Sequence, residues 1–320
     1  VKWFVLAAEQ GSISARHNLG KCYEFGRGVE QDYSQAAKHY HLSAEQGYAP
    51  SQVDLAVFYE NGWGVEESLE KALHFNRLAA EQGFAIGQSN LGYLYKHGKG
   101  VKQDFAEAAR WYCLAAAQGH ARAQFNLALM YDNGEGMPQD HAEAARLYRL
   151  AAEQGHEQAQ FNLAWMYDHG EGVPKDKAEA ARWYRLAAEQ GHARAQFNLA
   201  LMYNNGEGVP QNQAEAVRLY QLSAEQGFSR AMHNLGECYE KGDGVGQDFA
   251  KAMELYKQAF EKGYVFSAHS VGLLYEKGLG VSKNLKKATH WYRLGANGGD
   301  ETSQKALERC SRSSKGIFAF

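Results

Sequence analysis

The chain has 320 residues, of which 45% are hydrophobic and 22% are charged, a composition typical of a folded protein rather than a disordered one. Lys and Arg total 34 against 37 Asp and Glu, and the resulting net charge of −3 does not favour a nucleic-acid partner. The sequence contains no apolar run of about 18 residues, so no membrane-spanning helix is expected, and four Cys are too few for a disulfide framework.

The chain begins at Val1, without Met, in a segment that has the pattern of a helix. We therefore expect it to be a fragment of a longer protein, whose signal peptide, if it has one, lies outside this sequence. The compartment stays open, although unpaired cysteines are more typical of the cytoplasm.

One period of 36 residues runs through the whole chain. Glycine recurs at this spacing from Gly11 to Gly299, and a Gly-x-Gly pair recurs eight times in the same register. Such self-similarity predicts a repeat protein. The predicted parts are a lone second helix of a truncated repeat at 1–10, one solenoid domain of eight repeats at 11–298, a capping helix at 299–312 and a tail at 313–320.

The first half of each repeat predicts an amphipathic helix. In the repeat that begins at Gly119, Ala123, Leu127 and Tyr131 lie on one face of a helix with 3.6 residues per turn. The pair Gly134 and Gly136 predicts its end, because glycine tolerates the left-handed conformation of a helix C-terminus.

The second half predicts another helix. Asp140, followed by Glu143, has the spacing of an N-cap with a capping box, and Ala144 and Tyr148 begin an apolar face. Glu143 and Arg146 predict an exposed ion pair. Because only one to three residues link this helix to the next repeat, successive helices must be antiparallel neighbours. We predict an all-α fold: a right-handed superhelical solenoid of antiparallel helix pairs without a single central core.

The pattern resembles the Sel1-like repeat family, a relative of the tetratricopeptide repeats. It follows A-x-x-x-L-[AG]-x-x-Y in the first helix, G-x-G in the loop and A-x-x-[WLF]-Y-x-x-A-A-x-x-G in the second helix. In the fourth repeat these residues are Ala123, Leu127, Ala128, Tyr131, Gly134, Gly136, Ala144, Leu147, Tyr148, Ala151, Ala152 and Gly155. The resemblance implies a non-enzymatic scaffold or adaptor that binds other proteins. A cysteine-rich branch of the family has been linked to β-lactam binding, but its cysteine spacing is absent here, so a β-lactam-binding hydrolase is the lesser alternative.

Neither a metal nor a cofactor is predicted. His120, His156 and His192 share one repeat position, but helices pack about 8–10 Å apart, too far for successive copies to share one ion. The Gly-x-Gly pairs lack the following Lys-Ser/Thr of a phosphate loop and are interpreted as turns.

A second apolar stripe on the first helix is the candidate binding site. Phe125 and Leu129 point away from the core face of their helix, and equivalent residues recur in the neighbouring repeats. In tetratricopeptide-like stacking the first helices line the concave surface, where exposed apolar residues form a groove for a partner segment. The predicted partner-binding residues are Tyr93, Phe125, Asn126, Leu129, Asp132, Phe161, Asn162, Trp165, Asp168, Phe197, Asn198 and Leu201. The alternative is that neighbouring helices cover this stripe.

Polar residues beside the stripe suggest the partner's chemistry. The recurring Asn126, Asn162 and Asn198 could hold an extended peptide backbone or, equally, tie down local loops. Asp132 and Asp168 favour a protein or peptide partner with basic residues next to hydrophobic ones.

The thiols and the ends complete the expectations. Cys22, Cys238 and Cys310 occupy an apolar repeat position and should be buried, whereas Cys113 stands where other repeats carry Arg and should be exposed. Trp3 and Leu6 of the lone helix lack a partner helix. That end is expected to be covered by a missing segment or by a second copy, so a self-assembling structural solenoid is a further alternative.

Overall fold

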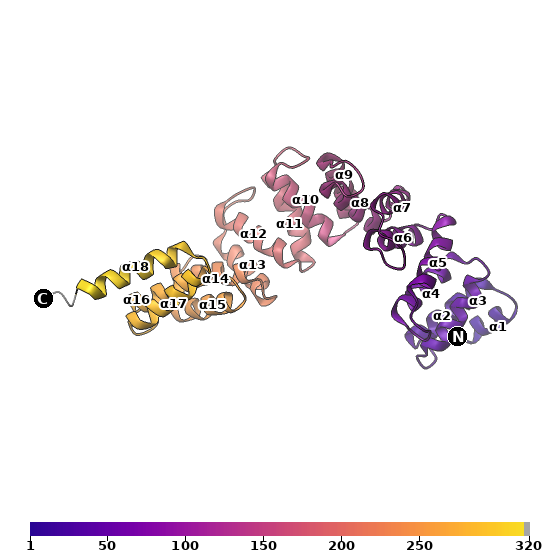
Figure 1. The fold of residues 1–320 in the computed structure, drawn as a ribbon, viewed down its shortest axis with the longest axis horizontal. Helices are drawn as coiled ribbons and strands as arrows, with labels where there is room; N and C mark the ends of the chain where they lie inside the picture. The colour runs from indigo at the N-terminus through magenta and orange to yellow at the C-terminus, as the bar shows by residue number, and fades with distance from the viewer. Residues whose placement is uncertain (317–320) are drawn as a thin grey trace. The chain divides into compact units, whose positions relative to one another are not determined.

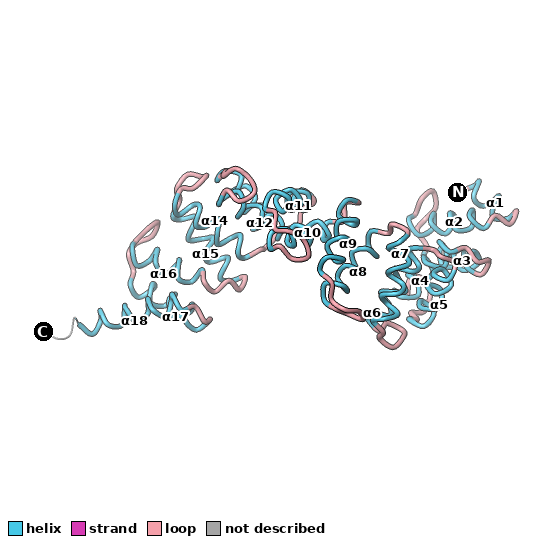
Figure 2. The backbone as a smooth tube through the Cα atoms, turned by 90° about the horizontal axis from the view of Figure 1, so that it is seen from above, coloured by secondary structure: helices cyan, strands magenta, loops and turns pink. Residues whose placement is uncertain are grey.

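The computed structural model describes the backbone of residues 1–316 and the side chains of residues 1–310, and over that range it is helical, with no strand (Figure 2). The predicted all-α fold of antiparallel helix pairs is confirmed. The predicted capping helix, α18, continues to Gly316, beyond the expected boundary at 312. Of the predicted tail at 313–320, residues 317–320 lie outside the described part.

Each repeat contributes a first and a second helix, as the period predicts. The first helices are α2 (Ile13–Phe25), α4 (Ala49–Asn61), α6 (Ala85–His97), α8 (Ala121–Asn133), α10 (Glu157–His169), α12 (Ala193–Asn205), α14 (Ser229–Lys241), α16 (Ser267–Lys277) and α18 (Glu301–Gly316). The second helices are α1 (Lys2–Glu9), α3 (Tyr33–Ala44), α5 (Leu69–Glu81), α7 (Phe105–Ala117), α9 (His141–Glu153), α11 (Lys177–Glu189), α13 (Gln213–Glu225), α15 (Phe249–Glu261) and α17 (Leu285–Asn297).

The described chain forms two compact units. Unit 1 comprises Val1–Ala159 and Glu171–Val173, and unit 2 comprises Gln160–Gly170 and the chain from Pro174 onward. Within each unit a helix packs on its neighbours in the chain, from α1 to α9 and from α11 to α18, and Figure 1 shows this succession from α2 to α5 and from α14 to α17. The repeats that were expected to form one domain are thus divided between two compact units.

The two loop glycines have different roles. Gly134 ends α8 with φ 69° and donates its N–H to the Met130 carbonyl, as expected for a left-handed C-cap. Gly136 also has a positive φ, and a Cβ there would lie 2.6 Å from the carbonyl of Phe105, at the start of the preceding second helix. The pair therefore ends one helix and lets the loop lie directly against the previous repeat.

The predicted capping box is only half correct. The Asp140 carboxylate accepts hydrogen bonds from the N–H groups of Ala142 and Glu143 and caps α9. The Asp140 N–H, which a capping box would pair with Glu143, instead donates to the Tyr131 carbonyl at 3.0 Å. Glu143 is free to form the predicted ion pair with Arg146, at 2.6 Å. The backbone bond across the loop, which recurs in all eight repeats, fixes where the second helix begins.

The core is divided among the repeats. The recurring alanines of the second helix, such as Ala144 and Ala252, are fully buried, and so are the tyrosines four residues later, such as Tyr148 and Tyr256. Separate clusters form around these positions, for example around Tyr40 in unit 1 and around Tyr256 in unit 2. This arrangement is the one expected of a solenoid, in which each repeat buries its apolar surface against its neighbours.

Candidate functional site

The predicted partner-binding residues lie on one side of the first helices, which we name the A-face and define in the fourth repeat by Phe125, Asn126, Leu129 and Asp132. Its two apolar positions, one helical turn apart, differ in exposure. Phe125 and its equivalent Phe197 are 9% and 8% exposed. Phe161 and the residues of the second position, Tyr93, Leu129, Trp165 and Leu201, are half-buried.

An aromatic ring from the next repeat covers the first position. His156, at the start of α10, stacks on Phe125 with a ring-centroid distance of 4.5 Å. Phe161 stacks on His192 in the same way, at 4.5 Å, whereas Phe197 meets Phe228 edge to face, at 5.1 Å. Phe125 and Phe197 are therefore not the exposed groove residues that the stripe predicted, because each is enclosed by a side chain 31 residues further along the chain.

The second position keeps an accessible edge. Trp165 stacks on His169 with a centroid distance of 4.2 Å. Tyr93 lies 4.4 Å from His97, and the Lys99 ammonium is 5.0 Å from the Tyr93 ring centroid. The Arg122 guanidinium of the next repeat also lies 5.7 Å from the Tyr93 ring centroid. Both aromatic rings pack against other side chains and remain half-buried, an arrangement that holds a contact residue in one orientation.

A small hollow opens beside Leu201 in unit 2. It has a volume of about 180 Å³, and Leu201, Asn204, Tyr220, Asn234 and Glu237 contribute to its walls. The hollow therefore combines an apolar side chain with amide and carboxylate groups, which can bind a short polar segment of a partner.

The recurring asparagines make hydrogen bonds within the chain in two repeats. Asn90 donates to the Asn76 amide oxygen at 3.2 Å, and Asn234 donates to the Tyr220 hydroxyl at 3.3 Å. Both acceptors belong to the preceding second helix. These two bonds favour the local role over the peptide-binding one at Asn90 and Asn234, and the binding role of Asn126, Asn162 and Asn198 stays a prediction.

The two predicted aspartates also have partners inside the chain. Asp132 accepts a hydrogen bond from the buried Tyr148 hydroxyl at 3.5 Å and lies 2.8 Å from His141 Nδ1. Asp168 forms an ion pair with Lys177. A basic residue of a partner would have to compete with these contacts.

The acidic position of the A-face serves the buried tyrosines in other repeats as well. The Tyr256 hydroxyl donates to Glu240 at 2.7 Å, and the Tyr292 hydroxyl donates to Glu276 at 2.5 Å. Burial and the carboxylate raise the pKa of both phenols. Sequence reasoning missed this role, although the constant spacing of 16 residues between the acid and the tyrosine was visible.

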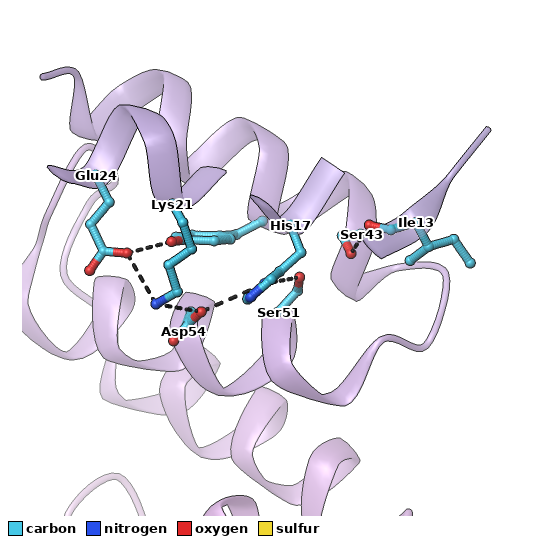
Figure 3. Close-up of polar contacts among 8 residues, drawn as sticks. Ile13, His17, Lys21, Glu24, Ser43, Ser51 and Asp54 are labelled. Carbon is cyan, nitrogen blue, oxygen red and sulfur yellow. Dashed lines mark hydrogen bonds and ion pairs between the residues drawn. The ribbon is translucent and has the colours of Figure 1, made fainter. Parts of the chain in front are cut away.

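The A-face is strongly polar at the start of unit 1 (Figure 3). His17 Nδ1 lies 3.0 Å from the Ser51 hydroxyl, and the Lys21 ammonium lies 2.9 Å from Asp54 and 3.3 Å from Glu24. Burial lowers the pKa of His17 and raises that of Asp54. His17 and Lys21 stand where the fourth repeat carries Phe125 and Leu129, so an internal polar network replaces the apolar pair here.

The recurring histidines cap helices. The Ala123 N–H donates to His120 Nδ1 at 3.2 Å, and His156 and His192 accept equivalent bonds at 3.3 and 3.1 Å. Burial lowers the pKa of His120 and His156. Among the described residues no group of three or more His, Cys, Asp and Glu is arranged to hold a metal ion.

A ladder of glutamines was also missed by sequence reasoning. Gln124 is 4% exposed, donates to the Ala116 carbonyl at 3.3 Å and accepts a hydrogen bond from Gln154 at 2.8 Å. The equivalent pairs are Gln52 with Gln82, Gln88 with Gln118, Gln160 with Gln190, and Gln196 with Gln226. The constant spacing of 30 residues within each pair was the available signal.

Three of the four cysteines lie where the repeat position predicts, since Cys22 and Cys238 are buried and Cys113 is exposed. Cys310, at the same repeat position as Cys22 and Cys238, is only half-buried. Burial raises the pKa of Cys238 to about 11. Across the described helices, none is long and apolar enough to cross a membrane.

One short sequence, Ser68 to Lys71, has the Ser-x-x-Lys spacing of some hydrolases. Its serine has a structural role, because the Ser68 hydroxyl accepts a hydrogen bond from the Lys71 N–H and caps α5.

Comparison with known proteins agrees with this architecture. The Sel1 repeat profile matches nine consecutive segments, at residues 1–12, 13–48, 49–84, 85–120, 121–156, 157–192, 193–228, 229–264 and 265–300. None of the curated proteins compared with the chain matches it.

Solved structures of other proteins also resemble the chain. A protective antigen of uropathogenic Escherichia coli strains, described as having an SLR fold, is 37% identical with a TM-score of 0.92, and the match covers 96% of this chain and 66% of the antigen. A Sel1 repeat protein from Oxalobacter formigenes is 34% identical with a TM-score of 0.64, and the match covers 77% of this chain and 96% of that protein. Helical repeat solenoids of this kind are typical of proteins that bind other proteins. The chain belongs to the Sel1 repeat family.

Proposed function

We propose that this chain is a non-catalytic scaffold that binds a segment of another protein on the A-face, the side that tetratricopeptide-like stacking makes concave. The proposal rests on one observation: side chains of the next repeat enclose the first apolar position more completely than the second. Phe125 is enclosed by His156, whereas Leu129, Trp165 and Leu201 remain half-buried. A partner can therefore bury the second position without displacing any side chain of the repeat core.

The binding surface belongs to each unit separately. In unit 1, Tyr93 and Leu129 supply apolar contacts, with Asn126 beside them. In unit 2, Trp165 and Leu201 supply them, with Asn162 and Asn198 beside them. Phe125, Phe161 and Phe197 support these contacts from below. Binding energy in protein interfaces is concentrated in a few aromatic and hydrophobic contacts.

The partner's preference for basic residues is proposed in a revised form. Asp132 and Asp168 are already paired with His141 and Lys177, so these aspartates would add little to affinity. A basic residue of the partner would be attracted instead by a more exposed acidic side chain of the same face.

The test is a single substitution at the second position. A partner is first captured from a lysate of the source organism, and its affinity is then measured for the wild type and for Trp165→Ala. We expect the variant to bind more weakly by about 1–3 kcal/mol, because truncation of an interface aromatic removes a main contact. Trp63→Ala is the matched control, since Trp63 is also part-exposed but lies in the loop after α4, outside the A-face.

Thermal unfolding separates binding from packing. Trp165→Ala should leave the free energy of unfolding nearly unchanged. If it destabilises the chain by about 3–5 kcal/mol, as truncation of a core aromatic does, Trp165 is a packing residue and the proposed surface is wrong. Equal affinities of wild type and variant for the captured partner would have the same consequence.

A second candidate function is self-association through α1. Trp3 is 79% exposed, and Phe4 and Leu6 of the same helix are 37% and 41% exposed. Three large apolar side chains on one short helix form the type of patch that associates with another protein surface. A structural role, with copies joined end to end, follows from this patch.

A further inference from the structure

A second and larger hollow lies on the A-face of unit 2, where α14 and α16 meet the start of α18. Its volume is about 590 Å³, and its walls include His233, Glu237, Tyr264, Phe266 and His269. Glu237 also lines the hollow beside Leu201. The two hollows therefore share a carboxylate.

The walls of this hollow are aromatic. Phe266 is 51% exposed, its ring centroid is 5.3 Å from that of Tyr264, and the Tyr264 centroid is 5.0 Å from that of His233. At the position of Phe266, the repeats of unit 2 before it carry Arg194 and Arg230. A phenyl ring has thus replaced a cation at this place.

The hollow also carries a partly exposed carboxylate. Glu237 stands where the preceding repeats have Trp165 and Leu201, and its side chain is 44% exposed. It lies 3.5 Å from His233 Nε2 and 3.4 Å from the Lys241 ammonium. Lys241 is 58% exposed, and exposed pairs of this kind contribute little free energy. A hydrogen bond from His233, followed by the charge of Lys241 against the opposing effect of burial, lowers the pKa of Glu237, which keeps it ionised.

The other acids of the hollow reinforce this charge. Glu301, in the first turn of α18, is exposed. Asp300 caps that helix through Thr302 and Ser303, at 2.5–3.1 Å. None of the residues that line the hollow is Lys or Arg.

One imidazole of the wall lacks the bond that its equivalents make. His17 and His233 each lie about one hydrogen-bond length from a serine 34 residues further on, at 3.0 and 2.9 Å. The equivalent serine of His269 is Ser303, which donates to Asp300 instead. His269 Nδ1 is buried without a hydrogen-bond partner. The ring packs on Tyr292, with a centroid distance of 5.5 Å.

We propose that this hollow binds an arginine side chain of the partner segment, with the guanidinium paired to Glu237 and stacked on Phe266. Guanidinium is planar, is weakly hydrated compared with ammonium, stacks on aromatic rings and presents paired donors to a carboxylate. The inference deepens the proposed function, on which it rests for the existence of a partner. It assigns the attraction of a basic partner residue to Glu237 instead of Asp132 and Asp168.

The test uses the full chain and a small probe, Nα-acetylarginine amide. Binding is followed by the aromatic NMR signals of a chain labelled with ¹³C in Phe and His. A single side chain should bind weakly, with a Kd on the order of 1–10 mM. Nα-acetylcitrulline amide, which has nearly the same shape without the charge, should bind at least tenfold more weakly, and Nα-acetyllysine amide should bind several-fold more weakly.

Variants locate the site. Glu237→Gln should weaken arginine binding at least fivefold. Phe266→Arg should abolish it, because this variant places a guanidinium where the preceding repeats have one. Glu254→Gln is the matched control, since Glu254 is an exposed acid of the same unit on α15, outside the hollow. All variants should keep the wild-type melting temperature.

The outcomes are distinct. Equal affinity for arginine and citrulline, an unchanged affinity in Glu237→Gln, or the absence of any shift at 50-fold or greater excess of probe each overturns the inference. These results would leave the proposed function standing if Trp165→Ala still weakened the partner. Conversely, arginine binding lost only in the Glu237 and Phe266 variants supports the hollow even if Trp165 has no role.

Discussion

Three first helices have a histidine as the N-cap, which makes the capping hydrogen bond depend on pH. His120, His156 and His192 cap their helices by accepting an N–H at Nδ1, which requires the neutral ring with its proton on Nε2. In the first repeat Ser12 accepts the equivalent bond from the Ala15 N–H. Serine caps at any pH, whereas histidine caps only while it is unprotonated.

The stability of the chain should therefore fall in mild acid. Burial lowers the pKa of His120 and His156 below the unfolded value near 6.5. The unfolded state then binds more protons, so the contribution is complete above about pH 6.5 and is lost as the pH falls through the folded pKa. Loss of one cap costs roughly 0.5–2 kcal/mol.

Urea unfolding at pH 7.5 and pH 5 measures this effect. His120→Ser should reduce the loss of stability between the two pH values, because serine keeps the cap and does not titrate. His290→Ser, at an exposed position of α17 without a capping bond in the structure as described, is the control. An identical pH dependence in wild type and His120→Ser would contradict the capping role.

The exposure of individual side chains could be predicted from the sequence only in part. The exposure of Cys113 and the burial of Cys238 followed from the residues at equivalent positions. The burial of Phe125 did not, because the ring that covers it, His156, belongs to the next repeat. A helical wheel contains one helix only, so it separates the two faces of α8 but does not show what lies over each face.

At the scale of helices, the period determined nearly every element and its end. The first helices end at left-handed glycines such as Gly134, and the second helices begin at caps such as Asp140, as predicted. The loop bond from the Asp140 N–H to the Tyr131 carbonyl was not predictable from capping rules, because it replaces the bond that those rules assign to Glu143. It depends on the loop's path, which Gly136 sets by lying against the previous repeat.

In the fourth repeat the glutamine ladder ties three helices together. Gln124 on α8 receives a hydrogen bond from Gln154, the C-cap of α9, and donates to Ala116 near the end of α7. Gln124 lies where few waters can replace a lost bond, since it is 4% exposed. A buried polar group without a partner costs about 1–3 kcal/mol.

Gln124→Ala should therefore lower the free energy of unfolding by about 1–3 kcal/mol. Gln158→Ala, at an exposed position of α10, should change it by less than about 0.5 kcal/mol. Chemical denaturation of both variants gives the comparison. If the glutamine hydrogen bonds do not contribute to stability, the two variants should have equal free energies of unfolding.

At the scale of the whole chain, the exposed apolar side chains of α1 predict association. We expect the apparent mass of the chain to rise with concentration in static light scattering, because Trp3 and Leu6 offer apolar surface to a second copy. Trp3→Glu should suppress this rise.

A substitution is preferable to removal of α1 in this experiment. Ala8 of that helix is buried against its neighbour, so deletion would expose new surface. Trp63→Glu is the control for a part-exposed tryptophan elsewhere in unit 1. A mass that stays constant over the concentration range, or that rises equally in Trp3→Glu, would exclude α1 as the contact.

The candidate binding site could be predicted from the sequence only in part. Periodicity placed Trp165 and Leu201 on one side of the first helices, and their half-burial agrees with a contact role. It could not show that Asp168 already has Lys177 as a partner, because that pair spans a loop whose path depends on the neighbouring repeat. The hollow at Glu237 and Phe266 lies where the residues differ from those at the equivalent positions of other repeats. A search for recurring residues does not find such positions.

The second loop glycine has a consequence for how such a chain can change its length. A Cβ at Gly136 would meet Phe105, one repeat earlier, and the ring of His156 stacks on Phe125, also one repeat earlier. Because each of these contacts joins adjacent repeats, removal or insertion of 36 residues restores the same contacts between equivalent residues. An insertion of one residue within a repeat would instead separate Gly136 from Phe105 and His156 from Phe125 at once. We therefore expect the chain to lengthen or shorten by whole repeats more readily than by a single residue placed between these contacts.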